Sequence, residues 1–171
     1  MTRTIAAAAM AGVLLLGGCS DMFDKGPPPK RQPGSWSQKV ELVKVEGKDA
    51  DKIKAEMQPG MAMANSMSIC VTPEMAAKED LVDSIKKMTS TGECKIDQQD
   101  LEGKNISFTG TCKGANGESA KVSLKATLSA TSQDSTRTID GPTKIEIKTH
   151  ATRNGECTAK DLKIPAGMGS M

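Results

Sequence analysis

The chain has 171 residues with 23 basic and 21 acidic side chains, and its formal net charge is +2. The charges are interspersed and form no blocks, which argues against a nucleic-acid partner and against an acidic substrate. Only 2% of the residues are aromatic and there is no tyrosine. A core of mostly aliphatic side chains is thin, so we expect covalent cross-links to contribute much of the stability.

The first 18 residues have the features of a secretory signal peptide. Arg3 supplies one positive charge, and an apolar run follows from Ile5 to Leu16. As a helix this run would span about 18 Å, which is too short for the roughly 30 Å hydrocarbon core of a bilayer. We therefore expect export and removal of residues 1–18.

The sequence Leu-Gly-Gly-Cys at residues 16–19 resembles the lipobox of bacterial lipoproteins, with Gly17 where Ala or Ser is more frequent. The resemblance implies that Cys19 becomes the acylated first residue. Ser20 resembles the outer-membrane sorting pattern of Gram-negative lipoproteins, although Asp21 follows one place later. The expected location is therefore the cell envelope, with a lipid anchor in the outer membrane and the chain on the periplasmic face.

Residues 19–34 are expected to be a tether between the anchor and a folded domain. They contain the triplet Pro27-Pro28-Pro29, which favours extended polyproline structure and forms a semi-rigid spacer. About fourteen such residues reach roughly 45 Å at full extension. The domain is expected at residues 35–158, and residues 159–171 are expected to be a flexible tail.

The cysteines divide into one lipid carrier and four that can cross-link. With Cys19 assigned to the lipid, an even set remains: Cys70, Cys94, Cys112 and Cys157. In an exported domain of this size four cysteines indicate two disulfides. Their wide spacing lacks the close ligand pairs that a zinc site needs.

Alternating apolar and polar residues predict a domain of mainly β structure. The clearest strand is residues 122–130, and others are expected at 36–45, 65–71, 94–99, 106–112, 136–139 and 143–152. The apolar phase switches at Val43 and Val45, which indicates a β-bulge. We expect an α+β fold of mainly β character, an antiparallel, curved sheet or partial barrel with one inserted helix.

That inserted helix is predicted at about residues 73–88. Thr72 suits the N-cap and Pro73 the first helical position. One apolar stripe follows: Ala77, Leu81, Ile85 and Met88. A shorter helix is expected from Asp49 to Met57, ended by Pro59-Gly60. We expect the longer helix to cover the small side chains of strand 122–130, which would equally suit a lipocalin-like cup for a small apolar ligand.

A turn decides the expected disulfide pairing. Asp100–Gly103 suits a three-residue hairpin loop with a glycine bulge. Cys94 then faces Gly110 and lies diagonally from Cys112 on the same face, near enough to bridge.

The expected disulfides are therefore Cys94–Cys112 and Cys70–Cys157. The long bridge would tie the strand before the helix to the last strand. The rival pairing, Cys70–Cys94 with Cys112–Cys157, would close the helix into a loop and stays open at this point.

Several short motifs follow one another in a fixed order. They are Pro-Gly-x-Trp at residues 33–36, a Met/Pro/Gly-rich stretch at 57–63, Cys-x-Thr-Pro-Glu at 70–74, and three further cysteines ending at Cys157. Together they resemble a family of small exported bacterial proteins known as domain of unknown function 3617. This chain lacks the family's frequent strand aromatics between Cys112 and Cys157. The resemblance implies an envelope location and a β-rich fold, and it implies no activity.

Catalytic residues are not apparent in the sequence. His150 is the only histidine, and it falls on the Lys/Glu face of a predicted strand. No G-x-S-x-G motif is present, and the mature cysteines are assigned to disulfides. We therefore expect neither an enzyme nor a cofactor, but a binding or accessory module. Its expected partners are the membrane through the lipid, and an envelope protein or a small apolar ligand.

The methionines offer an alternative. Met57, Met61, Met63 and Met67 lie in one segment, and thioethers are soft ligands that select Cu(I). A loop carrying them would make a periplasmic Cu(I)-binding protein. The simpler interpretation is that these flexible side chains fill gaps or form an adaptable contact surface, and we prefer it.

Overall fold

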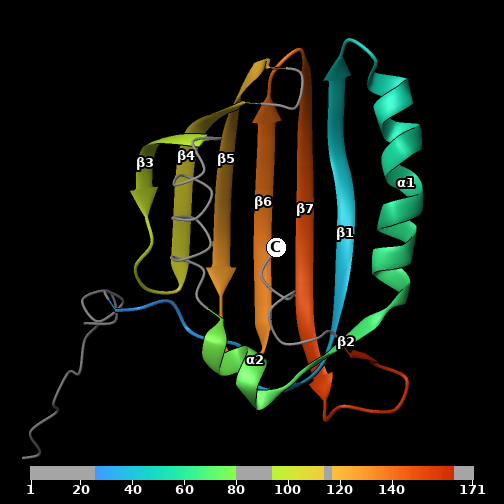
Figure 1. The fold of residues 1–171 in the computed structure, drawn as a ribbon, viewed down its shortest axis with the longest axis vertical. Helices are drawn as coiled ribbons and strands as arrows, with labels where there is room; N and C mark the ends of the chain where they lie inside the picture. Colours follow the sequence, from blue (N-terminus) through green and yellow to red (C-terminus); the bar gives the residue numbers. More distant parts are fainter. Residues whose placement is uncertain (1–25, 80–93, 114–116, 164–171) are drawn as a thin grey trace, which may run out of the picture.

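A computed structural model of the chain describes residues 26–79, 94–113 and 117–163. They form one eight-stranded sheet in the order β3-β4-β5-β6-β7-β1-β2-β8, with two helices beside it (Figure 1). Every neighbouring pair is antiparallel except β2 and β8. The order does not close on itself, so the mainly β class with an open antiparallel sheet is confirmed.

The elements have the following bounds. The helices are α1 (Ala50–Ser66) and α2 (Pro73–Lys78). The strands are β1 (Gly34–Gly47), β2 (Ser68–Val71), β3 (Cys94–Asp100), β4 (Asn105–Lys113), β5 (Ser119–Leu128), β6 (Ser132–Asp140), β7 (Thr143–Gly155) and β8 (Leu162–Lys163). The meander places α2, the β3–β4 turn, the β5–β6 turn and the start of β1 at one end of the sheet, which we call the α2 end (Figure 1).

The core gathers at the α2 end on one face of the sheet. Ile106, Ala126 and Leu128 form one buried cluster, against which the half-buried Leu101 packs. The second cluster combines residues from β1, β2 and α2: Trp36, Val71 and Ala76. Both clusters are small, in agreement with the low aromatic content of the chain.

Around Trp36 the sequence motifs at residues 33–36 and 70–74 meet in what we call the lock. Its members are Gly34, Ser35, Trp36, Cys70, Val71, Ala76, Cys157 and Asp161. Gly34 has φ +142°, and a Cβ there would collide with the Gly155 carbonyl oxygen and the Arg153 side chain. Only glycine allows β1 and β7 to approach so closely.

Asp161 fastens the chain after β7 to this lock. Its carboxylate accepts hydrogen bonds from the Ser35 hydroxyl at 2.7 Å, from the Ser68 hydroxyl and from the Thr158 amide. The hydrogen bond from Ser68, then those from Thr158 and Ser35, hold the pKa of this carboxyl well below its ordinary value. The side chain is buried, and its charge is satisfied by these donors.

A β-bulge in β1 confirms the expected change of phase. The pairing of β1 with β7 shifts register between Leu42 and Lys44, which leaves Val43 as the extra residue. Val43 is 48% exposed and Val45 only 7%, so the bulge returns the apolar side chains to the core face.

The first helix is longer than expected. The prediction that it ends at Pro59-Gly60 is wrong, because α1 contains Pro59 and continues to Ser66, and the next strand begins at Ser68 instead of Asn65. A proline inside a helix frees one carbonyl group. No residue of α1 is buried, so water can bind the freed group. Asn65 holds the helix against β1, with its side-chain amide bonded to both the amide and the carbonyl of Val40.

The second helix begins as expected and ends early. Thr72 is its N-cap and accepts from the Met75 amide at 3.2 Å. The prediction of a helix continuing from residue 73 to 88 is wrong at Glu79, which has ψ 111° and lies outside the helix. Ala76 and Met75 pack on the cluster around Trp36 and not on strand β5. The remaining expected positions, Leu81, Ile85 and Met88, lie outside the described residues.

Two disulfides join Cys70 to Cys157 and Cys94 to Cys112. These are the pairs expected from the turn, but the expected register is wrong. Cys94 lies directly opposite Cys112 and not opposite Gly110, because the hairpin loop is longer than the expected three residues and Asp100 pairs with Ser107. A one-residue register shift between Ile96 and Gln98 then brings the two cysteines face to face. The first bridge lies at the α2 end and the second at the opposite end of the sheet.

Candidate functional site

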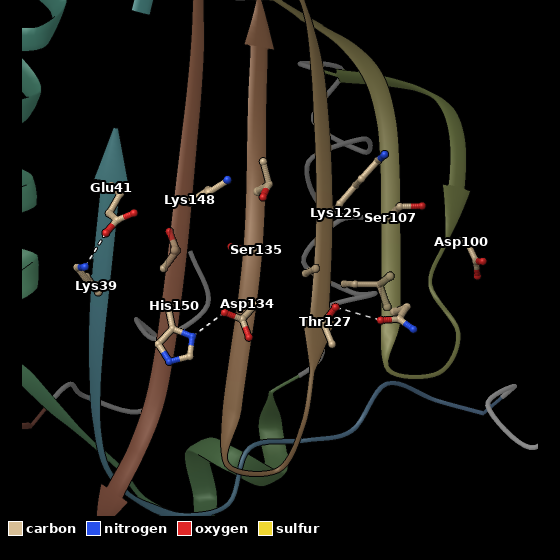
Figure 2. Close-up of a pocket in the computed structure, with 15 residues that line it drawn as sticks. Lys39, Glu41, Asp100, Ser107, Lys125, Thr127, Asp134, Ser135, Lys148 and His150 are labelled. Atoms are coloured by element: carbon tan, nitrogen blue, oxygen red, sulfur yellow. Dashed lines mark hydrogen bonds and ion pairs between the residues drawn. The ribbon is translucent and has the colours of Figure 1, made fainter. Parts of the chain in front are cut away.

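A hollow of about 860 Å³ lies on the polar face of the sheet, opposite the core. Its lining comes from β1, β3, β4, β5, β6 and β7, and Figure 2 labels residues from each of these strands. Alternate residues of neighbouring strands stand in register on this face. The result is two rows of polar side chains that cross the sheet.

The row nearer the α2 end contains the histidine. Its members, from β4 to β1, are Asn105, Thr127, Asp134, His150 and Lys39. Asn105 accepts from the Thr127 hydroxyl at 3.0 Å. The next row contains Ser107, Lys125, Thr136, Lys148 and Glu41. Both rows therefore mix hydroxyl groups with charged groups, and the two hydroxyl groups of the second row flank Lys125.

His150 is held between two partners. Its Nδ1 lies 2.6 Å from Asp134 Oδ1, and its Nε2 lies 2.8 Å from the Thr152 hydroxyl (Figure 2 shows the first contact). The order carboxylate, imidazole, hydroxyl orients the ring as a proton acceptor toward Thr152. The side chains of His150 and Asp134 are 56% and 60% exposed, so water competes with both contacts. These contacts orient the His150 ring, but they do not shield it from water as a catalytic site would.

The lysines of the hollow differ in their partners. Lys39 donates to Glu41 at 2.6 Å, and this hydrogen bond together with the opposite charge raises the pKa of Lys39 and lowers that of Glu41. Lys148 stands opposite Glu41 in the register and adds to the lowering of its pKa. Lys125 makes no ion pair with any residue that the structure describes. Its ammonium group is available to a ligand.

Charge and hydrogen-bonding capacity define what the hollow can bind. Three lysines are balanced by Glu41, Asp100 and Asp134. Between these charges stand the hydroxyl and amide groups of both rows. Such a surface suits a polar ligand that carries hydroxyl groups or charges of both signs, and it offers little to an apolar one.

The methionines do not form a loop. Met57, Met61 and Met63 lie within α1, and Met67 is its C-cap residue. Met61 lines a groove of about 590 Å³ between α1 and β1, whereas Met63 is 61% exposed. Two residues apart on a helix point in directions about 160° apart. Met61 and Met63 therefore do not converge, and the contact-surface interpretation fits this arrangement better than a shared Cu(I).

Other expected site residues are placed as follows. Cys19 lies outside the described residues, and the other four cysteines are in the two disulfides. Within the described residues, no three His, Cys, Asp or Glu side chains gather in a group able to hold a metal ion. No helix in the described part of the chain has the length and hydropathy needed to cross a membrane.

Sequence reasoning missed most of the hollow. It placed His150 on a polar strand face but did not connect this residue to Asp134, Lys125 or Thr136. The available signal was the polar half of each alternating strand. A row becomes visible only when strand order and register are known, and the residues that β1 and β7 contribute to each row are more than a hundred positions apart in the chain.

Comparison with known proteins gives one match. A family model described as a protein of unknown function (DUF3617) matches residues 31–157. No curated protein and no solved structure is significantly similar to the chain.

Proposed function

This chain belongs to the DUF3617 family, a family of unknown function, and we propose that it is a lipid-anchored binding protein of the bacterial envelope. In this proposal Cys19 carries the lipid, the anchor lies in the outer membrane, and the sheet faces the periplasm. The protein acts as a non-enzymatic module, and the hollow on its polar face receives the ligand or partner.

The two rows of polar side chains carry the binding part of the proposal. They present hydroxyl and charged groups side by side over a hollow of about 860 Å³, and Lys125 has no ion pair among the described residues. The ligand class that fits is polar, with hydroxyl groups or with charges of both signs.

The anchoring part rests on residues 1–19. A charged start, an apolar run too short to span a bilayer, and the sequence Leu-Gly-Gly-Cys support it. Two acyl chains, at ~0.8 kcal/mol for each buried CH₂ group, make such an anchor effectively permanent. Mass spectrometry of the N-terminal peptide tests it. An acylated Cys19 is expected, and a mature N-terminus at any other residue would overturn the anchor.

A photo-crosslinking amino acid placed at Thr136 tests the hollow in intact cells. Thr136 lies in the middle of the second row, and its neighbour Arg137 points to the other face, so Arg137 is the matched control position. We expect a crosslinked product from position 136 that is absent from position 137 and weaker with Lys125→Ala. Identical products from both positions, or none from position 136, would contradict binding in the hollow.

A further inference from the structure

Residues 26–33, expected to be part of the tether, run along the α2 end of the sheet (Figure 1). The Gly103 amide, in the β3–β4 turn, donates to the Gly26 carbonyl at 2.6 Å. The Gln32 amide donates to the Ala130 carbonyl, in the β5–β6 turn, at 2.8 Å. The segment, which we call the strap, is therefore hydrogen-bonded to two turns at the α2 end of the sheet.

Side chains of the strap bind α2 and the lock. Lys30 Nζ donates to the Ala77 carbonyl at 2.6 Å. The Arg31 guanidinium pairs with Glu79 at 2.8 Å and lies 5.5 Å from the centre of the Trp36 ring. The Arg31 side chain is only 19% exposed, so this ion pair is better shielded from water than those of the polar face.

The strap shortens the free part of the expected tether. Only seven residue steps separate Cys19 from Gly26, which is at most about 25 Å of fully extended chain. A tether free as far as residue 34 would reach roughly 45 Å. The sheet itself is long, since the 14 residues of β1 extend about 45 Å from the α2 end to the opposite end.

We infer that the α2 end of the sheet faces the membrane at short range, with the bilayer surface as its neighbour. This rests on the proposed anchor at Cys19. The first row of the hollow begins at Asn105, immediately after the β3–β4 turn. The hollow therefore opens beside the lipid headgroups, whereas the opposite end of the sheet, with its Cys94–Cys112 bridge, points away from the membrane.

Trp36 is a native probe of this arrangement, because it is the only tryptophan, the chain has no tyrosine, and it lies at the α2 end. The chain from Cys19 onward is coupled through that thiol to a maleimide lipid in phosphatidylcholine vesicles. The coupling is selective, because the other four cysteines are in disulfides. Energy transfer from Trp36 to a dansyl-labelled headgroup is then measured.

We expect efficient transfer in the unmodified chain. Fifteen Gly/Ser residues inserted after Ser20 lengthen the free tether from seven to about 22 residues, which raises its average reach by about 11 Å and should lower the transfer. The same fifteen residues appended after Met171 are the matched control and should leave it unchanged. Weak transfer in the unmodified chain, or no effect of the insertion after Ser20, would overturn the inference.

Hydrogen exchange separates the strap from the anchor. In the uncoupled chain the Gln32 amide should exchange slowly, because it is bonded to the Ala130 carbonyl. Rapid exchange at Gln32 would refute the strap. The vesicle measurement uses a chemical lipid, so its outcome does not depend on natural acylation. Failure of acylation in cells would instead refute the proposed anchor and leave the strap intact.

Discussion

The lock and the polar hollow are built from opposite kinds of contact. In the lock, Trp36 is 3% exposed and Val71 1%, a disulfide joins β2 to the segment after β7, and a buried carboxylate has its hydrogen bonds satisfied. In the hollow, His150 and Asp134 are more than half exposed, and Lys125 has no ion pair with a described residue. The lock stabilises the fold, and the hollow presents to solvent polar groups that can still form hydrogen bonds with a ligand.

This difference separates motif from function. The motifs at residues 33–36 and 70–74, which support the family membership, lie in the lock, where they have packing and geometric tasks. The residues of the hollow lie in none of these motifs, since each of six strands contributes only one to three of them. The shared motifs of this chain therefore report how it folds, and what it binds has to be found on the other face.

The largest expected effect is removal of the disulfide in the lock. Cys70→Ala/Cys157→Ala opens a loop of 87 residues, worth about 4–5 kcal/mol on the chain-entropy model. Cys94→Ala/Cys112→Ala opens one of 18 residues, worth about 3 kcal/mol. Urea unfolding of both variants measures which of the two disulfides contributes more to the free energy of unfolding. A smaller loss of stability without Cys70–Cys157 than without Cys94–Cys112 would contradict the comparison, because the disulfide of the lock would then not be the more stabilising one.

The next effect tests the packing of the lock. Trp36→Ala should lower the free energy of unfolding by about 3–5 kcal/mol, because it empties a nearly closed site between Val71 and Ala76. Trp36→Phe keeps an aromatic ring in the site but loses the hydrogen bond from Nε1 to the Gln32 carbonyl, and should lower the free energy of unfolding by about 1–2 kcal/mol. Equal losses of stability for both variants in urea unfolding would show that the hydrogen bond to Gln32 contributes more than burial of the Trp36 ring does.

Much of the sheet follows from local patterns in the sequence. Residues 122–130 alternate cleanly and form β5, and the change of phase at Val43 marks the bulge in β1. The errors arise where a contact with a residue distant in the sequence accompanies the end of an element. The second helix was expected to continue along its apolar stripe, but α2 ends at Lys78. The next residue, Glu79, binds Arg31, which is 48 residues away in the chain.

The hairpin register and the hollow failed for a related reason. The turn at residues 100–103 suggested a three-residue loop with a bulge at its glycine, yet Asp100 pairs with Ser107 and the register shift lies between Ile96 and Gln98, nearer the disulfide. The hollow needs β1 beside β7 and every row in register, which alternation within single strands does not specify. The sequence showed which residues are polar, but not which of them meet.

Acid should weaken the lock through Asp161. Its pKa is 3.8 when unperturbed and lies lower in the fold, so the unfolded chain takes up the proton first. The contribution is fully present above about pH 5 and is lost as the pH falls toward the lower folded value. Asp161→Asn should therefore lose less stability between pH 6 and 3 than the unmodified chain, measured by urea unfolding. Asp140→Asn, at an exposed residue of the opposite end, controls for the lost charge, and an identical pH slope for both variants would argue against the role of Asp161.

The smallest expected effect lies in the hollow, at the contact between Asp134 and His150. Both side chains are more than half exposed, and exposed ion pairs typically contribute below about 1 kcal/mol. A double-mutant cycle with Asp134→Ala and His150→Ala should give a coupling energy in that range, while the same variants reduce crosslinking from position 136. A coupling above about 2 kcal/mol would place this pair among the contacts that hold the fold. Low coupling with undiminished crosslinking would remove His150 from the binding surface. The contrast with the lock holds if Asp134 and His150 contribute to ligand binding and contribute little to the free energy of unfolding.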